Sequence, residues 1–133
     1  MGWDYIDGNN DYEFEVDKFF SIGELIDVCN QNPDCVVYFV GTQMAPGKLG
    51  SWRGSYDIPA IEPIYEDRTG KQVARQLEED LKKTHYGYKG GEYKYCADSE
   101  FYISPYGSAR EYKVAKAEVV DGELILYTKL DPY

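Results

Sequence analysis

The stretch YKVAKAEVVDGELILYT, residues 112–128, decides the fold that the sequence predicts. Asp121-Gly122 lies between two runs rich in strand-forming residues, and both positions tolerate a positive φ. Asp-Gly in this setting is among the strongest short-range signals of a β-hairpin. The sequence therefore predicts strands at 112–120 and 123–128 that pair in an antiparallel sheet.

Four other segments are expected to be strands. Cys35 to Val40 is apolar throughout, which is typical of a central strand. Ile58 to Tyr65 contains Pro59 and Pro63, which cannot donate to a sheet ladder, so an edge strand is the most that we expect there. Residues 92–96 and 101–104 complete the set, on either side of a polar turn at 98–99.

Two helices are expected on one face of this sheet. Ser21 with Glu24 three residues later forms a capping box and predicts a helix from about Ile22 to Asn30. Thr69 caps a second helix of about fifteen residues, on which Val73, Leu77 and Leu81 form one apolar stripe. The sequence predicts an α+β fold, with residues 1–133 as a single domain.

The charge of the chain limits its partners. The 24 acidic and 14 basic residues give a formal net charge of −10, which disfavours both nucleic-acid backbone and anionic membrane surfaces. Six acids between Asp4 and Asp17 precede the first base, Lys18. Such a run is typical of a solvated edge, and an acidic imitation of DNA is the alternative interpretation.

Cysteine usage and the beginning of the chain point to a soluble protein of the cytoplasm. Cys29, Cys35 and Cys96 contain no CxxC pair, so we expect neither disulfides nor zinc, and interpret all three as small core residues. The first residues lack the features of a signal peptide, and the longest apolar run, CVVYFV, is too short to span a bilayer.

No familiar catalytic pattern is present. The chain has one histidine, His85, and no HExxH pair, GxSxG elbow or GxxxxGK[ST] phosphate loop. We therefore expect no enzyme activity, metal or cofactor. Catalysis by a pair of carboxylates stays open, because acids are numerous and no spacing excludes a pair.

Residues 35–56 contain no carboxylate and carry the first binding signal. Glycines from Gly47 to Gly54 open the backbone, Arg53 offers a bidentate fork for phosphate, and Trp52 and Tyr56 supply rings. These residue types suit a small phosphorylated aromatic molecule. The alternative is structural: Arg53 pairs with an acid and Trp52 fills the core.

Two later segments repeat this combination. Residues 85–91 place His85, Tyr86 and Tyr88 beside Lys89 and three glycines. Residues 101–110 contain no acid and end in Arg110. If the fold brings the three segments together, two arginines can hold phosphates while rings sandwich a base, which would suit a small nucleotide.

The same segments resemble a group of small phage proteins. SWRGSY, residues 51–56, followed by PAIEP, residues 59–63, is similar to their S-Y-R-G-Y-Y…L-A-L-E-P signature. KTHYGYKGGEY, residues 83–93, is similar to K-T-F-x-G-Y-K-G-G-E-F, and Tyr106-Gly107…Arg110 fits a closing Y-G…R. The resemblance covers roughly half of the chain, and the family is that of the Thoeris anti-defence sponges.

The resemblance implies a phage protein that captures, without degrading it, the cyclic ADP-ribose isomer that a bacterial TIR enzyme makes as an alarm. It implies an α+β subunit, a homodimer or a larger assembly of dimers, ligand pockets near the subunit interface, and action in the cytoplasm of the infected host. Arg53 and Arg110 would contact phosphate. The family's stacking ring falls on His85, a departure that leaves Tyr86 or Tyr88 as alternatives, and Trp52 replaces a tyrosine.

Two other functions remain open at this point. An acidic inhibitor that imitates DNA would bind a host defence factor through the run from Asp4 to Asp17. A hydrolase would bind the same cyclic nucleotide and cleave it.

Overall fold

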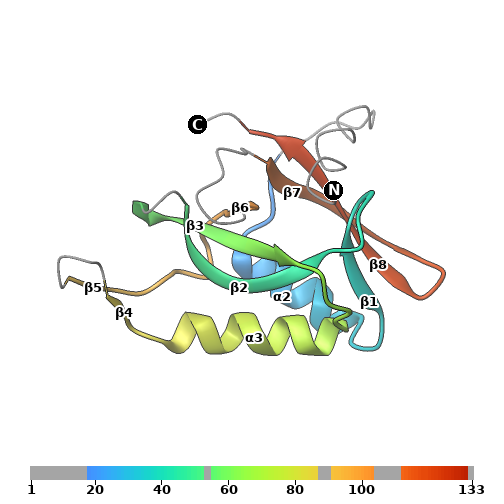
Figure 1. The fold of residues 1–133 in the computed structure, drawn as a ribbon, viewed down its shortest axis with the longest axis horizontal. Coiled ribbons are helices and arrows are strands. Elements are labelled where there is room, and N and C mark those ends of the chain that lie inside the picture. The colour runs from blue at the N-terminus through green and yellow to red at the C-terminus, as the bar shows by residue number, and fades with distance from the viewer. Residues whose placement is uncertain (1–17, 53–54, 87–90, 104–111, 132–133) are drawn as a thin grey trace.

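The computed structural model describes residues 18–52, 55–86, 91–103 and 112–131, with the backbone alone at 52 and 55–57 (Figure 1). Two helices and eight strands alternate along these residues in an α+β fold, as predicted. In chain order they are α2 (Ile22–Gln31), β1 (Val36–Phe39), β2 (Ala45–Trp52), β3 (Ser55–Ile64), α3 (Gly70–Lys82), β4 (His85–Tyr86), β5 (Glu92–Tyr93), β6 (Tyr102–Ile103), β7 (Tyr112–Val120) and β8 (Glu123–Leu130).

The main sheet has six strands in the order β1-β8-β7-β6-β3-β2. Neighbouring strands are antiparallel except in two places: β1 runs parallel to β8, and β3 runs parallel to β6. The sheet is therefore mixed, whereas the sequence predicted an antiparallel one. Parallel pairing follows from long crossovers between strands that are distant in the chain, which local signals do not reveal.

The predicted hairpin is confirmed. β7 and β8 pair from Tyr112↔Leu130 to Val120↔Glu123. Asp121 and Gly122 form the turn with φ of 50° and 79°, the left-handed region that this turn requires.

β1 lies at the edge of the sheet, so the prediction of a central strand was wrong. Its free side is nevertheless covered, because Val37 donates its N–H to the carbonyl of Arg68 (2.9 Å) and Val36 forms a bridge with Thr69. Val37 and Phe39 are fully buried. An edge strand that is covered in this way can be as apolar as a central one.

β3 is an internal strand, so the prediction of an edge strand was also wrong. It pairs with β2 on one side and with β6 on the other. β6 contacts it only at Ala60 and Ile61. Because this short ladder ends before Pro63 and begins after Pro59, neither proline has to donate to β6.

Both helices cover the same face of the sheet, as predicted (Figure 1). The capping boxes at Ser21 and Thr69 are present, with Glu24 and Gln72 as their partners. α3 is thirteen residues long and buries Val73 and Leu77 completely. The core between helices and sheet also contains large side chains from α2 and all six strands of the main sheet: Ile22, Leu25, Phe39, Leu49, Ile61, Ile103, Val114, Leu124 and Leu126.

The segments expected at 92–96 and 101–104 form only short strands. β5 pairs with β4 in a separate two-stranded ribbon, and β6 joins the main sheet. The cysteine prediction holds for Cys29, whose burial raises the pKa of its thiol to about 12. The prediction of a core position is wrong for Cys96, which is exposed. Cys35 is half-buried.

Candidate functional site

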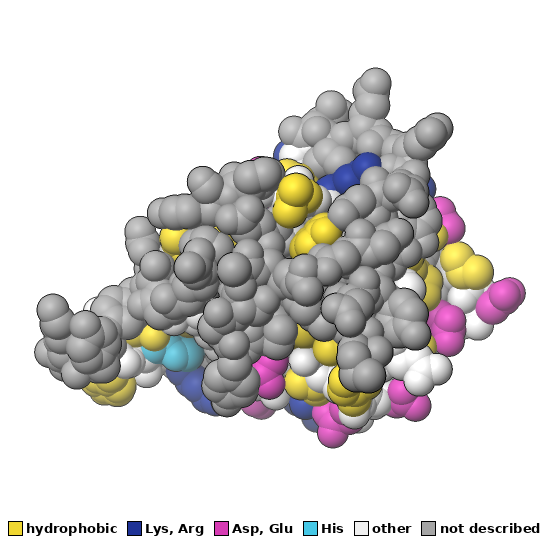
Figure 2. All heavy atoms as spheres, turned by 45° about the horizontal axis from the view of Figure 1, so that its top comes forward, with side chains coloured by type: hydrophobic (Ala, Val, Ile, Leu, Met, Phe, Trp, Pro, Cys, Tyr) yellow, Lys and Arg dark blue, Asp and Glu magenta, His cyan; other side chains and the backbone are white. Residues whose placement is uncertain are grey.

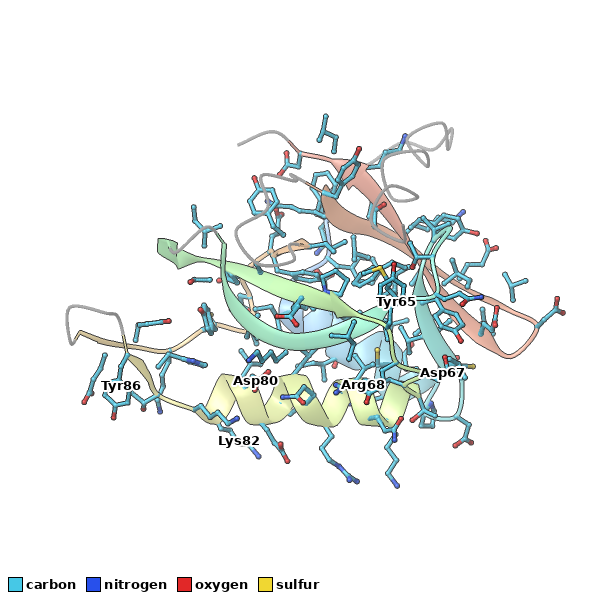
Figure 3. The ribbon with its side chains drawn as sticks, viewed as in Figure 1. Tyr65, Asp67, Arg68, Asp80, Lys82 and Tyr86 are labelled. Carbon is cyan, nitrogen blue, oxygen red and sulfur yellow. The ribbon has the colours of Figure 1, made fainter. Side chains whose placement is uncertain are left out.

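The β4–β5 ribbon carries the two predicted site residues whose side chains are described. The ribbon extends from the end of α3 away from the main sheet (Figure 1). Tyr86 is 66% exposed, so its ring is open to solvent (Figure 3). His85 is half-buried, and its Nε2 lies 3.1 Å from the carbonyl oxygen of Asp80.

Two tyrosines pack around His85. The Tyr93 ring stacks on the imidazole with centroids 5.5 Å apart, and Tyr95 meets it edge-on at 4.8 Å. Tyr93 and Tyr95 also contact each other edge-to-face at 5.4 Å. The three rings hold one another in fixed orientations, which a site that stacks on a flat ligand requires.

The hydroxyl of Tyr95 is the buried polar group of this ring cluster. Tyr95 is 7% exposed, and its oxygen has no partner at full hydrogen-bonding geometry within the described part of the chain. Burial, with the nearby Tyr93 hydroxyl, raises the pKa of Tyr95, and Ser51 lies close enough to lower it slightly. Ser51 belongs to β2, the strand that ends at Trp52.

Asp80, on α3, contacts both β2 and His85. Its carboxylate is 3% exposed and accepts the N–H of Leu49 in β2 at 2.9 Å. The side-chain amide of Gln76 donates to both carboxylate oxygens at 3.1 and 3.2 Å, and Lys83 Nζ lies 3.6 Å away. Asp80 therefore connects α3 to β2 through its side chain and to His85 through its backbone (Figure 3).

Sequence reasoning missed Asp80. The available signal was its position on α3, three residues after Leu77, which places an acid on the apolar stripe. A carboxylate on a buried face needs several hydrogen bonds to offset its lost hydration. A buried acid on a helix is therefore expected to accept hydrogen bonds from the elements packed against that helix.

The other predicted residues divide into two groups. Trp52 ends β2 and pairs with Ser55 at the start of β3, and Tyr56 follows in β3, so their backbones flank residues 53–54. Arg53, Tyr88, Lys89 and Arg110 lie outside the described residues. Thus two of the three predicted segments are linked through Asp80, which contacts Leu49 of β2 and His85 of β4.

The third segment, residues 101–110, leaves the sheet at a different place. Its strand β6 ends at Ile103, which pairs with both Ile61 in β3 and Tyr112 in β7. Ile61 is six residues beyond Ser55 along β3. Six residues of strand span at most about 20 Å, so the anchors of the first and third segments lie within that distance of each other in one subunit.

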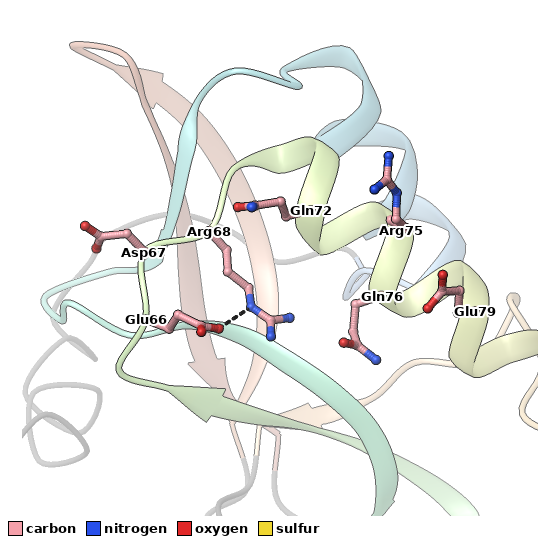
Figure 4. Close-up of a pocket in the computed structure, with 7 residues that line it drawn as sticks. All are labelled: Glu66, Asp67, Arg68, Gln72, Arg75, Gln76 and Glu79. Carbon is pink, nitrogen blue, oxygen red and sulfur yellow. Dashed lines mark hydrogen bonds and ion pairs between the residues drawn. The ribbon is translucent and has the colours of Figure 1, made fainter.

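A polar groove lies beside α3, next to the connection that follows β3, where no site was predicted (Figure 4). It encloses about 310 Å³ between the helix and the connection that follows β3. Its lining mixes acids, arginines and amides: Glu66, Asp67, Arg68, Gln72, Arg75, Gln76 and Glu79. Arg68 Nε and Glu66 form an ion pair of 2.8 Å within it. The mixture does not favour a ligand of one charge.

The chain matches no family model, no curated protein and no solved structure. No three His, Cys, Asp or Glu side chains of the described residues are grouped so that they could hold a metal ion. In the same part of the chain, no helix is long and apolar enough to cross a membrane. The function therefore has to be argued from the residues themselves.

Proposed function

We propose that this chain is a phage-encoded sponge that binds a cyclic ADP-ribose-type nucleotide and holds it intact, so that TIR-based bacterial defence is blocked. The observation that carries the proposal is that Asp80 contacts both Leu49 of β2, through its carboxylate, and His85, through its carbonyl oxygen. Leu49 lies two residues before the SWRGSY segment, and His85 belongs to the KTHYGYKGGEY segment, which is distant in the sequence. These are the two segments on which the resemblance to the sponges depends.

The chemistry of this end of the molecule suits a nucleotide. Aromatic rings that are fixed by their neighbours can stack on a base at a low entropic cost. The exposed lysines Lys82, Lys83 and Lys94 lie close to the ring cluster in the sequence, whereas acids surround the turn of the β7–β8 hairpin. Figure 2 shows the imidazole at the surface next to basic side chains, and acidic side chains toward the opposite end.

A site shared by two copies is part of the proposal. Arg53 and Arg110 belong to segments whose anchors lie within about 20 Å of each other along β3. A homodimer in which each copy contributes one arginine would let both contact a single compact ligand. The resemblance to the sponges is our reason for retaining the dimer, or a multiple of dimers, in the proposal.

A sponge requires equilibrium binding and no chemistry. Free signal falls when binding sites outnumber signal molecules and dissociation is slow. His85, Tyr86 and Tyr88 are the candidates for stacking on the base, Lys89 adds charge, and Trp52 and Tyr56 flank the arginine turn. Arg53 and Arg110 are proposed to bind the phosphates through paired hydrogen bonds.

Calorimetric titration of Arg53→Ala with cyclic ADP-ribose isomers tests the proposal. The parent should bind one isomer tightly, and the variant should lose a few kcal/mol of affinity, because a bidentate contact to phosphate is removed. Arg75→Ala is the matched control, since it removes the same charge from the exposed side of α3. Equal affinities of Arg53→Ala and parent would contradict the proposed role of Arg53.

A further inference from the structure

The contacts around Asp80 form a circuit that joins β2, α3 and β4. Its carboxylate accepts from Leu49 in β2, and its carbonyl oxygen faces Nε2 of His85 in β4. The His85 ring in turn contacts Tyr93 and Tyr95. Movement of the last turn of α3 would therefore displace His85 and β2 relative to each other.

The carboxylate is the part of this circuit that must be held in place by hydrogen bonds. It is 3% exposed, and such a group persists in a protein only when hydrogen bonds replace its hydration. Leu49, Gln76 and Lys83 supply those interactions. β2 is the last strand of the sheet, and Asp80 satisfies an N–H that β3 does not take up.

The backbone contact also determines the form of the imidazole. A carbonyl oxygen only accepts, so Nε2 of His85 must carry the proton in the hydrogen bond to Asp80. The neutral ring then has an unprotonated Nδ1, for which no partner is found among the described residues. This nitrogen can accept a hydrogen bond from an amino or hydroxyl group of a ligand.

We propose that Asp80 is a positioning residue for the nucleotide site: it holds His85 in the Nε2-protonated form, at a fixed distance from the β2 strand that leads to Trp52 and Arg53. The inference rests on the proposed function for the identity of the ligand. The structural part of the inference does not rest on the proposed function, because the position and tautomer of His85 can be measured in the free protein.

The experiment compares Asp80→Ala with Asp80→Asn. Asparagine keeps an acceptor for Leu49, and the Gln76 amide can turn to accept from the new side-chain nitrogen, so the circuit should survive. Alanine removes every side-chain contact. Val73→Ala is the control for general destabilisation, because Val73 is fully buried on the same helix but outside the circuit.

The first readout is ¹⁵N NMR of the His85 ring in the free protein. Parent, Asp80→Asn and Val73→Ala should all show the Nε2-protonated tautomer, and Asp80→Ala should show a mixture of the two neutral forms. An unchanged His85 spectrum in Asp80→Ala would overturn the inference, whatever the protein binds.

The second readout is the Kd for the cyclic ADP-ribose isomer that the parent binds. Asp80→Ala should weaken binding by about tenfold or more, which corresponds to the loss of one well-placed buried contact, while Asp80→Asn and Val73→Ala stay near the parent value. Parental affinity in Asp80→Ala would also overturn the inference. A parent that binds no such nucleotide would instead contradict the proposed function, and the NMR result would still decide the role of Asp80.

Discussion

Glu24 shows how a single carboxylate fixes the beginning of α2. The N–H of Ser21 donates to Glu24 Oε1 at 2.9 Å, and Glu24 donates its own N–H to Ser21 Oγ at 3.1 Å. Lys18 Nζ forms an ion pair with Glu24 Oε2 at 2.9 Å. The hydrogen bond from Ser21 is the largest of the effects that lower the pKa of Glu24, and Lys18 adds to it.

The lowered pKa of Glu24 predicts how stability depends on pH. A carboxyl with a lower pKa in the folded state stabilises the protein above its unfolded pKa, and this contribution is lost as pH falls through the folded pKa. We expect Glu24→Gln to be less stable than the parent by roughly 0.5 kcal/mol at pH 7, because glutamine keeps the capping bond but not the charge. Urea unfolding at pH 7 and pH 3 measures the difference.

The difference in stability should be smaller at pH 3 than at pH 7, because protonation of Glu24 removes the charge that distinguishes it from glutamine. Asp27→Asn, on the exposed side of the same helix, is the control for removal of an acid without a capping role. A difference between parent and Glu24→Gln that stays constant over this pH range would show that the Glu24 charge does not contribute.

At the scale of elements, the packing of α3 against α2 depends on Gly70. A Cβ at this position would lie 2.3 Å from the carbonyl oxygen of Asn32 and 2.5 Å from that of Cys29. Both atoms belong to the backbone at the end of α2, which cannot move aside like a flexible side chain. The first helical residue of α3 therefore has to be glycine for the two helices to approach so closely.

Gly70→Ala should destabilise the protein by about 1–3 kcal/mol, although alanine is the better helix former by about 1 kcal/mol. Gly50→Ala is the matched control, since a Cβ there would meet no atom within 4 Å. Thermal or urea unfolding of both variants measures the effect. A gain of stability in Gly70→Ala would mean that the helices are farther apart than described.

The elements also explain what the sequence could predict. Ser21, Thr69 and Asp121-Gly122 act through neighbours within four residues, so the helix starts and the β7–β8 hairpin were predicted correctly. The positions of β1 and β3 in the sheet depend on partners far along the chain: β1 pairs with β8, and β3 with β6. No local pattern contains that information, and both positions were predicted wrongly.

The residues of the candidate site could likewise be predicted only where a local pattern marks them. His85 and Tyr86 stood out because rings beside glycines and lysines are a local pattern. The roles of Tyr95 and Asp80 appear only when α3, β2 and the β4–β5 ribbon are seen together. For Arg53 and Arg110, which lie outside the described residues, the sequence remains the basis of the prediction.

At the scale of the whole molecule, the distribution of charge agrees with selective capture of a small anion. The net charge of −10 repels long nucleic acids, while the exposed lysines Lys82, Lys83 and Lys94 offset the acids near the aromatic ribbon. A cyclic nucleotide carries few charges and is therefore repelled less than a long nucleic acid. An acidic imitation of DNA would instead work through its carboxylates, and the rings and lysines of the β4–β5 ribbon would contribute nothing.

The central claim is that the protein retains a cyclic ADP-ribose-type nucleotide without changing it. The most direct measurement is to incubate the protein with these isomers, remove unbound ligand, denature the complex by heat and identify the released nucleotide by mass spectrometry. We predict recovery of the intact nucleotide in a fixed ratio to protein. Recovery of a cleaved product, or of no nucleotide, would contradict the account.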